Sequence, residues 1–317
     1  MDNLIFCLNA TVPLFVLMIL GYIFKKAGVF SEEFTSTMNS FVFKVALPVL
    51  VFKDLAAEDF VAVWDLKYVL FCFLVTSVCI AVSFGSTFLF KNGRDFRGEL
   101  TQASFRSSAA LLGIGFIQNI YGNSGMAPLM IIGTVPLYNI MAVVLLSVFK
   151  PSDEKGKIDN KLIKKTLIGI VTNPIIIGIV VGFAWSIIKI PQPVILTKTL
   201  NYIGGLATPL GLMAMGASFD IKKTGERIVP AIVASTFKLI VWCALFLPVA
   251  IRLGYATDKL IAVLVMLGSP TTVSSFIMAK SMGHEGTLSA TTVMITSLFS
   301  AFTLTFWLFV LKSMGLI

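Results

Sequence analysis

The stretch Leu260–Lys280 reads LIAVLVMLGSPTTVSSFIMAK and decides the fold. It is long and apolar enough to cross a hydrocarbon core as a helix, which takes about 20 residues. Pro270 follows Gly268 and Ser269 at its middle, where a proline removes one backbone hydrogen bond and clashes with the preceding turn. Inside a membrane such a break is tolerated where it is buried in protein or lines a cavity. The stretch therefore predicts a membrane-spanning helix that is interrupted at a functional site.

The rest of the chain has the same apolar character. Of its 317 residues, 57% are hydrophobic and 13% are charged, and the mean hydropathy is +0.93. These values exclude an ordinary soluble domain. The apolar runs show no period-two alternation, so each span must close its backbone hydrogen bonds internally, as a helix does. We predict an all-α polytopic membrane protein.

Apolar runs between charged residues or Pro and Gly predict ten transmembrane helices. The expected spans are 10–25, 39–56, 66–90, 99–120, 126–149, 167–188, 196–218, 229–251, 259–280 and 288–311. The expected units are a first five-helix repeat (1–149), a cytoplasmic loop (150–166) and a second five-helix repeat (167–317).

Equivalent helices of the two halves carry Pro, Gly and Ala residues at matching positions. At one constant shift along the chain the matching pairs are Pro13 with Pro174, Gly21 with Gly182, Ala46 with Ala207, Pro48 with Pro209 and Gly122 with Gly283. An odd number of spans per unit gives the units opposite orientations in the membrane, which is the inverted-repeat plan of many secondary transporters. We therefore expect a carrier with crossed, broken helices four and nine.

The net charge of +9 comes from Lys and Arg in short loops between apolar runs. Such residues are a topology signal, and we expect no nucleic-acid partner. The central loop and the loops on its side of the membrane hold more than half of the 25 basic residues. Because cytoplasmic loops carry this excess, we place the central loop in the cytoplasm and both termini outside the cell membrane.

Small and polar residues interrupt the fourth and ninth spans at matching depths. The candidate substrate-binding residues are Ser107, Ser108, Ala109, Gly113, Ser269, Pro270, Thr271 and Thr272, and the candidate helix-breaking residues are Gly113, Gly115, Gly268 and Pro270. Half-helix ends and unwound backbone supply binding groups in such carriers. The alternative is close helix packing, with hydroxyls bonded back to the preceding turn.

Two cations inside the spans are candidate electrostatic residues, because charge within a membrane is costly. Lys238 lies about 15 Å deep in the eighth span, at 1.5 Å per residue, and is too central to snorkel. Arg106 lies within snorkelling reach of the cytoplasmic face. All Asp and Glu fall at termini, in loops or at span ends, so we expect no carboxylate relay. These cations suit an anionic substrate, or a fixed charge that replaces a coupling ion beside half-helix C-termini.

Several motifs resemble the auxin efflux carrier family, including its bacterial malate and malonate permease branch. They are NSFVFKVALP at Asn39–Pro48, LGIGF at Leu112–Phe116, Tyr121-Gly122, Asn173-Pro174, and Ser269-Pro270 followed by Phe276 and Ala279-Lys280. The resemblance covers essentially the whole chain.

This resemblance implies an elevator-type carrier. Helices one, two, six and seven would form a scaffold, and helices three to five and eight to ten would form a moving transport domain. It also implies a homodimer with substrate at the crossing of helices four and nine. The chain has Ser107-Ser108 where plant members have Pro-Asn, and its central loop is short. We therefore expect a small organic anion, such as a carboxylate, instead of auxin.

Two other kinds of transport protein remain as alternatives. A sodium-coupled organic-anion symporter of the bile-acid type resembles the same ten-helix plan, and sodium dependence would distinguish it. A channel would show rings of charge or a filter motif, and saturable counterflow would exclude it.

We expect no enzyme, cofactor or metal site. An intramembrane protease needs buried aspartates, a Ser with a buried His, or HExxH, and the single histidine, His284, lies in a predicted loop. The four cysteines show no metal-ligand spacing.

Overall fold

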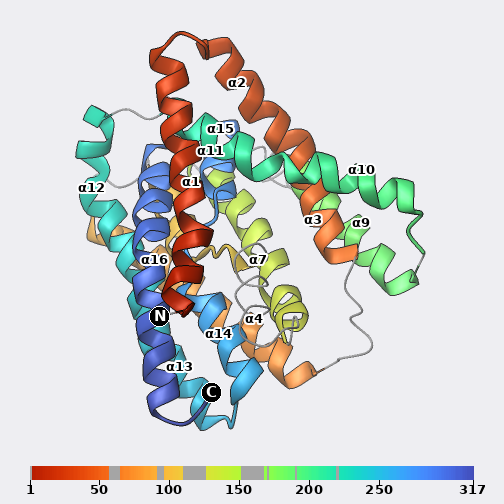
Figure 1. Cartoon of the computed structure of the whole chain (residues 1–317), viewed down its shortest axis with the longest axis vertical. Helices are drawn as coiled ribbons and strands as arrows, with labels where there is room; N and C mark the ends of the chain where they lie inside the picture. The colour runs from red at the N-terminus through yellow and green to blue at the C-terminus, as the bar shows by residue number, and fades with distance from the viewer. Residues whose placement is uncertain are drawn as a thin grey trace.

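The structure is a computed structural model that describes residues 2–56, 65–90, 96–109, 126–150, 168–169, 171–189, 191–218 and 221–317. Every regular element within these ranges is helical, as the sequence predicts (Figure 1). The elements are α1 (Asp2–Lys26), α2 (Glu32–Phe41), η1 (Val42–Ala46), α3 (Leu47–Ala56), α4 (Leu66–Ser86), η2 (Thr87–Leu89), α5 (Arg97–Phe105), α7 (Ala127–Val148), α9 (Pro174–Ile188), α10 (Val194–Gly205), α11 (Ala207–Ala217), α12 (Ile221–Thr236), η5 (Phe237–Val241), α13 (Trp242–Arg252), α14 (Thr257–Gly268), α15 (Ser274–Ser281) and α16 (Thr287–Ser313).

Five helical segments of the described chain are long and apolar enough to cross a membrane. They are Glu32–Ala56, Leu66–Leu89, Leu129–Val148, Gly225–Arg252 and Thr287–Ser313. Segments Glu32–Ala56 and Gly225–Arg252 each contain one π-helical turn, η1 and η5, and continue through it without a break. The prediction of a helical membrane protein is confirmed at this level.

Local sequence explains where several helices begin. Asn173 precedes α9, and its side chain accepts a hydrogen bond from the Ile175 amide at 2.9 Å, while Pro174 occupies the first helical position, where no donor is needed. Asp65 starts α4 by accepting from the Tyr68 amide at 3.1 Å. At α16 the acceptor comes from another helix, because the buried carboxylate of Glu99 accepts from the amides of Gly286 and Ser289.

Glycines allow close contacts between α1 and α11 and between α3 and α9. A Cβ added to Gly216 on α11 would lie 1.9 Å from the Met18 carbonyl oxygen of α1, and one added to Gly21 on α1 would lie 2.1 Å from the Met213 carbonyl oxygen. Gly178 on α9 meets the Pro48 carbonyl of α3 in the same way. Small residues of this kind allow helix backbones to approach closely in membranes.

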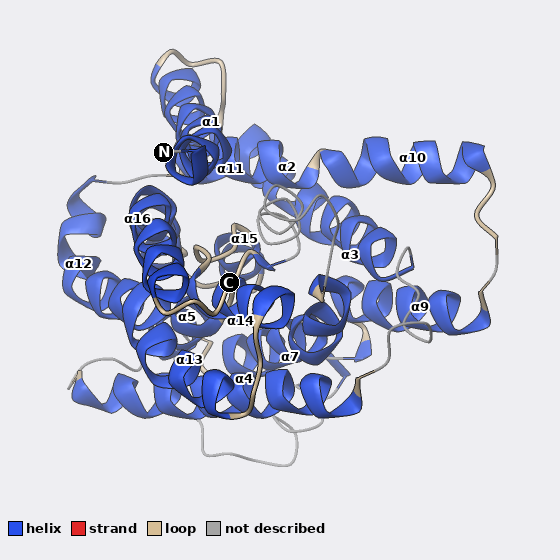
Figure 2. Cartoon of the chain, turned by 60° about the horizontal axis from the view of Figure 1, so that its bottom comes forward, coloured by secondary structure: helices blue, strands red, loops and turns tan. Residues whose placement is uncertain are grey.

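The short helices α5, α14 and α15 lie in the interior, surrounded by the longer helices (Figure 2). α5 packs on α4, α7, α12 and α16, while α14 packs on α13 and α16. The residues of α14 from Leu260 to Gly268 are all buried. A helix that is apolar on nearly every side, as α14 is from Leu260 onward, is typical of a protein interior.

Candidate functional site

The ends of α5 and α14 meet in the interior of the molecule, and at each of them the chain becomes extended. α5 ends at Phe105, and Arg106 continues in an extended conformation, with φ −69° and ψ 129°. α14 ends at Gly268, and Ser269 is also extended, with φ −69° and ψ 155°. The Ser108 amide donates to the Pro270 carbonyl oxygen at 2.9 Å, so the two extended segments pair directly. Each break therefore satisfies part of the backbone that the other exposes.

Hydroxyl groups hold this crossing together. The Ser107 hydroxyl donates to the Met266 carbonyl at 2.6 Å and lies 2.9 Å from the Ser269 hydroxyl. The Thr271 hydroxyl donates to the Ala103 carbonyl of α5 at 2.8 Å. The Thr272 hydroxyl lies 2.9 Å from that of Ser274, at the start of α15. Several predicted binding hydroxyls thus have structural partners, which agrees with the alternative of helix packing.

A cavity of about 100 Å³ opens beside the crossing. Its polar lining residues are Asp54, Arg106, Ser107, Ser108, Tyr138, Asn139, Thr208, Thr271, Thr272, Ser274 and Ser297, and the remaining lining is mostly aliphatic. These residues come from α3, α7, α11, α15, α16 and the two extended segments. A mostly apolar pocket with a few convergent polar groups is the usual form of a small-molecule site.

The structure brings only part of the predicted site to this cavity. Ser107, Ser108, Pro270, Thr271 and Thr272 line it, together with Arg106. The other predicted residues with described positions are not in the lining: they are Ala109, Gly268, Ser269 and Lys238. Gly113 and Gly115 lie outside the described residues.

Arg106 is buried, with an exposed fraction of 2%, so the expectation that it can snorkel to the cytoplasmic face is wrong. Its Nη2 donates to Asn139 Oδ1 at 2.8 Å, and its Nη1 contacts Gln102 Oε1 at 3.3 Å and the Met278 sulfur at 2.9 Å. These three partners come from three helices and fix the side chain inside.

The Arg106 charge lacks a counterion in the described part of the chain. No described carboxylate lies within ion-pair distance of its guanidinium, and its buried Nε has no hydrogen-bond partner. A buried cation without a paired anion is costly. An arginine fork is also well suited to a carboxylate. The cavity therefore presents a positive group that an anion can neutralise.

Lys238 is fully buried, and its ammonium contacts the end of a helix and does not line the cavity. Its ammonium donates to the Leu267 carbonyl and contacts the Met266 carbonyl oxygen at 3.4 Å, in the last turn of α14. The C-terminus of a helix carries partial negative charge, so a cation there is stabilising. Lys238 thus occupies the second of the two positions considered from sequence, beside a half-helix C-terminus.

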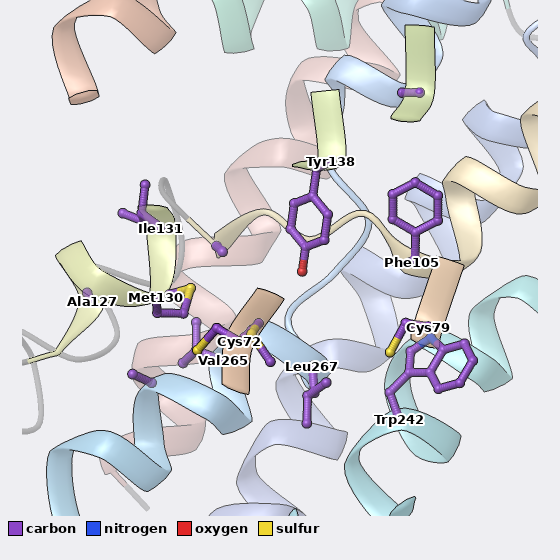
Figure 3. Close-up of a cluster of buried hydrophobic side chains, with 14 of the residues drawn as sticks. Cys72, Cys79, Phe105, Ala127, Met130, Ile131, Tyr138, Trp242, Val265 and Leu267 are labelled. Atoms are coloured by element: carbon purple, nitrogen blue, oxygen red, sulfur yellow. The ribbon is translucent and has the colours of Figure 1, made fainter. Parts of the chain in front are cut away.

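Trp242 donates a hydrogen bond to the C-terminal end of α5, as Lys238 does to that of α14. Its indole Nε1 donates to the Ser104 carbonyl at the end of α5 at 2.8 Å, and it follows Lys238 by one turn. One helix face therefore caps both half-helices. Figure 3 shows Trp242 and Leu267 within the buried cluster that also contains Phe105 and Tyr138.

Sequence reasoning missed Trp242, Gln102, Asn139 and Asp54. A hydrogen-bonding group inside an apolar span was the available signal for the first three. Asp54 occupies the last turn of α3, a span end as expected, yet it lines the cavity. A carboxylate at a span end can therefore still face the site, although a single carboxylate does not make a relay. Among the described residues no cluster of His, Cys, Asp or Glu has the arrangement of a metal site.

Comparisons with known proteins assign the chain to a family. The sequence pattern of the family described as "Membrane transport protein" matches residues 6–308. An uncharacterized transporter of Methanocaldococcus jannaschii is 25% identical over 92% of this chain and 94% of its own length. A Rhizobium meliloti protein named "Putative malonate transporter" is 23% identical over 95% of this chain and 94% of its own. The chain belongs to the membrane transport protein family, which is the auxin efflux carrier family whose motifs it carries.

Proposed function

We propose that this protein is a secondary transporter that moves small organic anions, such as carboxylates, across the cell membrane. The observation that carries the proposal is Arg106, a buried guanidinium that lines the cavity without a carboxylate partner among the described residues. The side-chain oxygens of Asn139 and Gln102 accept hydrogen bonds from the two terminal nitrogens of Arg106 and hold the guanidinium in place. An anion that binds in this cavity would neutralise a positive charge that is already held in position.

The cavity favours a small substrate. Its volume is about 100 Å³, and a water-sized group needs about 10–15 Å³ on the same measure, so the cavity has room for roughly seven to ten such groups. A short carboxylate matches this space better than an aromatic acid such as auxin. The relative named as a malonate transporter supports the same substrate class.

Alternating access is supported by the way the helices are grouped. α1 packs on α11, and α3 packs on α9 and α10, whereas α4, α5, α7 and α12 to α15 pack mainly with one another and with α16; α16 also packs on α1, so the two groups touch there. The cavity is lined from both groups. In our proposal the first group is the scaffold, with a homodimer contact, and the second is the transport domain, which moves like an elevator.

The breaks also support ten helices in two inverted repeats. The crossing pairs Ser108 in the fourth expected span with Pro270 in the ninth. The second and seventh spans are irregular at matching places, by the π-turn that ends at Ala46 and by the boundary between α10 and α11 at Leu206. We retain the topology with a cytoplasmic central loop and both termini outside.

Counterflow in liposomes tests this function. Purified protein is reconstituted, loaded with unlabelled malonate and assayed for uptake of labelled malonate or malate, for the wild type, Arg106→Gln and Arg252→Gln. Arg252 is exposed at the end of α13 and provides the matched control. Loss of a charge-assisted hydrogen bond costs about 1.5–3 kcal/mol, or about 10- to 100-fold in affinity.

We expect saturable exchange that survives Arg252→Gln and falls at least about tenfold in Arg106→Gln. Equal exchange in both variants contradicts the Arg106 site. Exchange that requires sodium favours the bile-acid type of symporter, and flux without saturation or counterflow favours a channel.

A further inference from the structure

Asp54 is the one carboxylate among the described residues that line the Arg106 cavity. Asp54 belongs to α3, in the proposed scaffold, whereas Arg106 follows α5, in the proposed transport domain. They do not form an ion pair with each other. The closest charged partner of Asp54 is its neighbour Lys53, at 3.6 Å between Nζ and Oδ1. An anion that enters this cavity therefore meets a cation and a carboxylate together.

Few other charged groups surround Asp54. Among the described residues of the elements packed against α3, η1 carries the exposed Lys44, and α10 carries the exposed Lys198 and Tyr202. α9 has no titratable residue between its ends, and Lys189 follows it. Across the cavity the titratable groups are Arg106 and Tyr138. Apart from Arg106 and Lys53, no described cation is placed to shield Asp54 from a bound anion.

An ionised Asp54 and a bound carboxylate anion in the same small cavity repel each other. A carboxylate beside a second carboxylate favours the protonated form of one of them. A protonated Asp54 would stop repelling the anion and could donate a hydrogen bond to it. Binding free energies are linked reciprocally, so a proton that improves anion binding is itself bound more tightly when the anion is present.

We propose that Asp54 is a proton-binding site linked to the anion site, so that each anion binds at Arg106 with uptake of one proton by the Asp54 carboxylate. The proton comes from water and adds to one carboxylate oxygen, and no other bond changes. This inference rests on the proposed function and adds a coupling ion to it. It also gives a use to a carboxylate at the end of α3 that no helix cap explains.

Calorimetry of malonate binding to the purified full chain tests the proposal. Titrations between about pH 6 and pH 8, in two buffers of different ionisation enthalpy, give the number of protons taken up per malonate. Unperturbed Asp and Glu carboxyls are ionised in this range, since their reference pKa values are near 4, and the upper half of the range is used for the proton count because the second carboxyl of malonate is itself partly protonated at the acid end. The variants are Asp54→Asn, Asp54→Glu and Arg106→Gln, with Glu33→Gln as the control, because Glu33 is an exposed carboxylate on α2.

For the wild type and Glu33→Gln we expect proton uptake that rises towards one with pH, and a malonate affinity that falls up to about tenfold per pH unit. Asp54→Asn should bind malonate with no proton uptake, and more tightly than the wild type at about pH 8, a gain that misfolding cannot produce. Asp54→Glu should retain uptake.

Two outcomes distinguish failure of the Asp54 proposal from failure of the proposed anion site. If malonate binds in an Arg106-dependent way but uptake is zero in the wild type, or is unchanged in Asp54→Asn, the Asp54 assignment is overturned and the anion site stands. If Arg106→Gln binds malonate as well as the wild type does, the proposed anion site itself fails, and with it the linkage.

Discussion

The Ser108 amide and the Pro270 carbonyl oxygen lie 2.9 Å apart and join the two interrupted helices backbone to backbone. Proline has no amide hydrogen of its own, yet its carbonyl remains free to accept because the helix has been broken there. The contact therefore uses the one backbone group that Pro270 retains for hydrogen bonding. Its loss would leave a buried acceptor unsatisfied.

Replacing Ser108 tests this contact without altering a charge. Ser108→Pro removes the donor and leaves the Pro270 carbonyl unpaired, which costs about 1–3 kcal/mol. We expect malonate counterflow to fall by at least about tenfold. Ser108→Ala keeps the backbone amide and should retain most of the exchange. Comparable loss in both variants would mean that the hydroxyl matters and the backbone pairing does not.

The contact between α1 and α11 predicts a stability effect away from the cavity. Gly216→Ala would place a Cβ 1.9 Å from the Met18 carbonyl oxygen, and overpacking of this kind costs about 1–3 kcal/mol. We expect the Tm of the purified protein to fall by several degrees. Gly85 on α4 has no heavy atom within 4 Å of an added Cβ, so Gly85→Ala should leave the Tm unchanged or raise it. A Tm of Gly216→Ala equal to that of the wild type would disprove the close contact.

Asp65 and Lys259 predict a pH-dependent contribution at the edge of the membrane region. The Lys259 ammonium lies 2.6 Å from the Asp65 carboxylate and, with the Tyr68 amide, lowers the pKa of that carboxyl. A lowered pKa stabilises the fold above the unfolded-state pKa of about 4, and this stabilisation is lost as the pH falls through the folded-state value. Both side chains are about one-third exposed, so screening keeps the pair below about 1 kcal/mol.

Thermal unfolding of Asp65→Asn and Asp65→Ala measures the two roles of Asp65 separately. Asp65→Asn keeps an acceptor for the Tyr68 amide and should lose less than about 1 kcal/mol at neutral pH. Asp65→Ala also removes the helix cap and should lose about 1 kcal/mol more. The difference between Asp65→Asn and the wild type should shrink below about pH 4. A difference that persists in acid would show that the ion pair is not its cause.

The break in the ninth span was predictable because its signal is local, whereas α5 ends at Phe105, ahead of Gly113 and Gly115, the residues expected to interrupt the fourth span. Gly268, Ser269 and Pro270 interrupt an apolar run by their own backbone chemistry. The depth of Lys238 was predictable from residue counting, since helical rise converts sequence position into distance. Both features depend on a single segment, and both lie in the interior of the structure as expected.

The environment of Arg106 was not predictable in this way. Its position seven residues after Glu99 indicated a side chain near the cytoplasmic face, but that argument assumes that Glu99 is at the surface. Glu99 is instead buried and caps α16. The partners of Arg106 come from α5, α7 and α15, which only tertiary packing brings together. Asp54 escaped notice for the same reason, because a span end can still face a cavity.

Lys238 predicts how the protein responds to sodium. Its ammonium occupies the negative end of α14, where a small cation would otherwise be attracted by the carbonyls of Met266 and Leu267. With Lys238 in place we expect no effect of sodium on the Tm or on malonate exchange. Lys238→Ala removes the charge and opens space at these carbonyls. Sodium should then bind the folded variant and raise its Tm, because a ligand of the folded state stabilises it by mass action.

The measurement is the Tm of the wild type and Lys238→Ala in sodium chloride and in choline chloride at equal ionic strength. A stabilisation of 1 kcal/mol corresponds to about 1.5 °C for a chain of this length, at about 2.1 cal/mol/K per residue, so a sodium-specific rise of one to a few degrees in the variant is the expected result. Lys312→Ala, an exposed lysine in the last turn of α16, is the control for loss of one positive charge. If Lys238→Ala shows no sodium-specific rise and still exchanges malonate, then the lysine caps α14 without standing in for a cation.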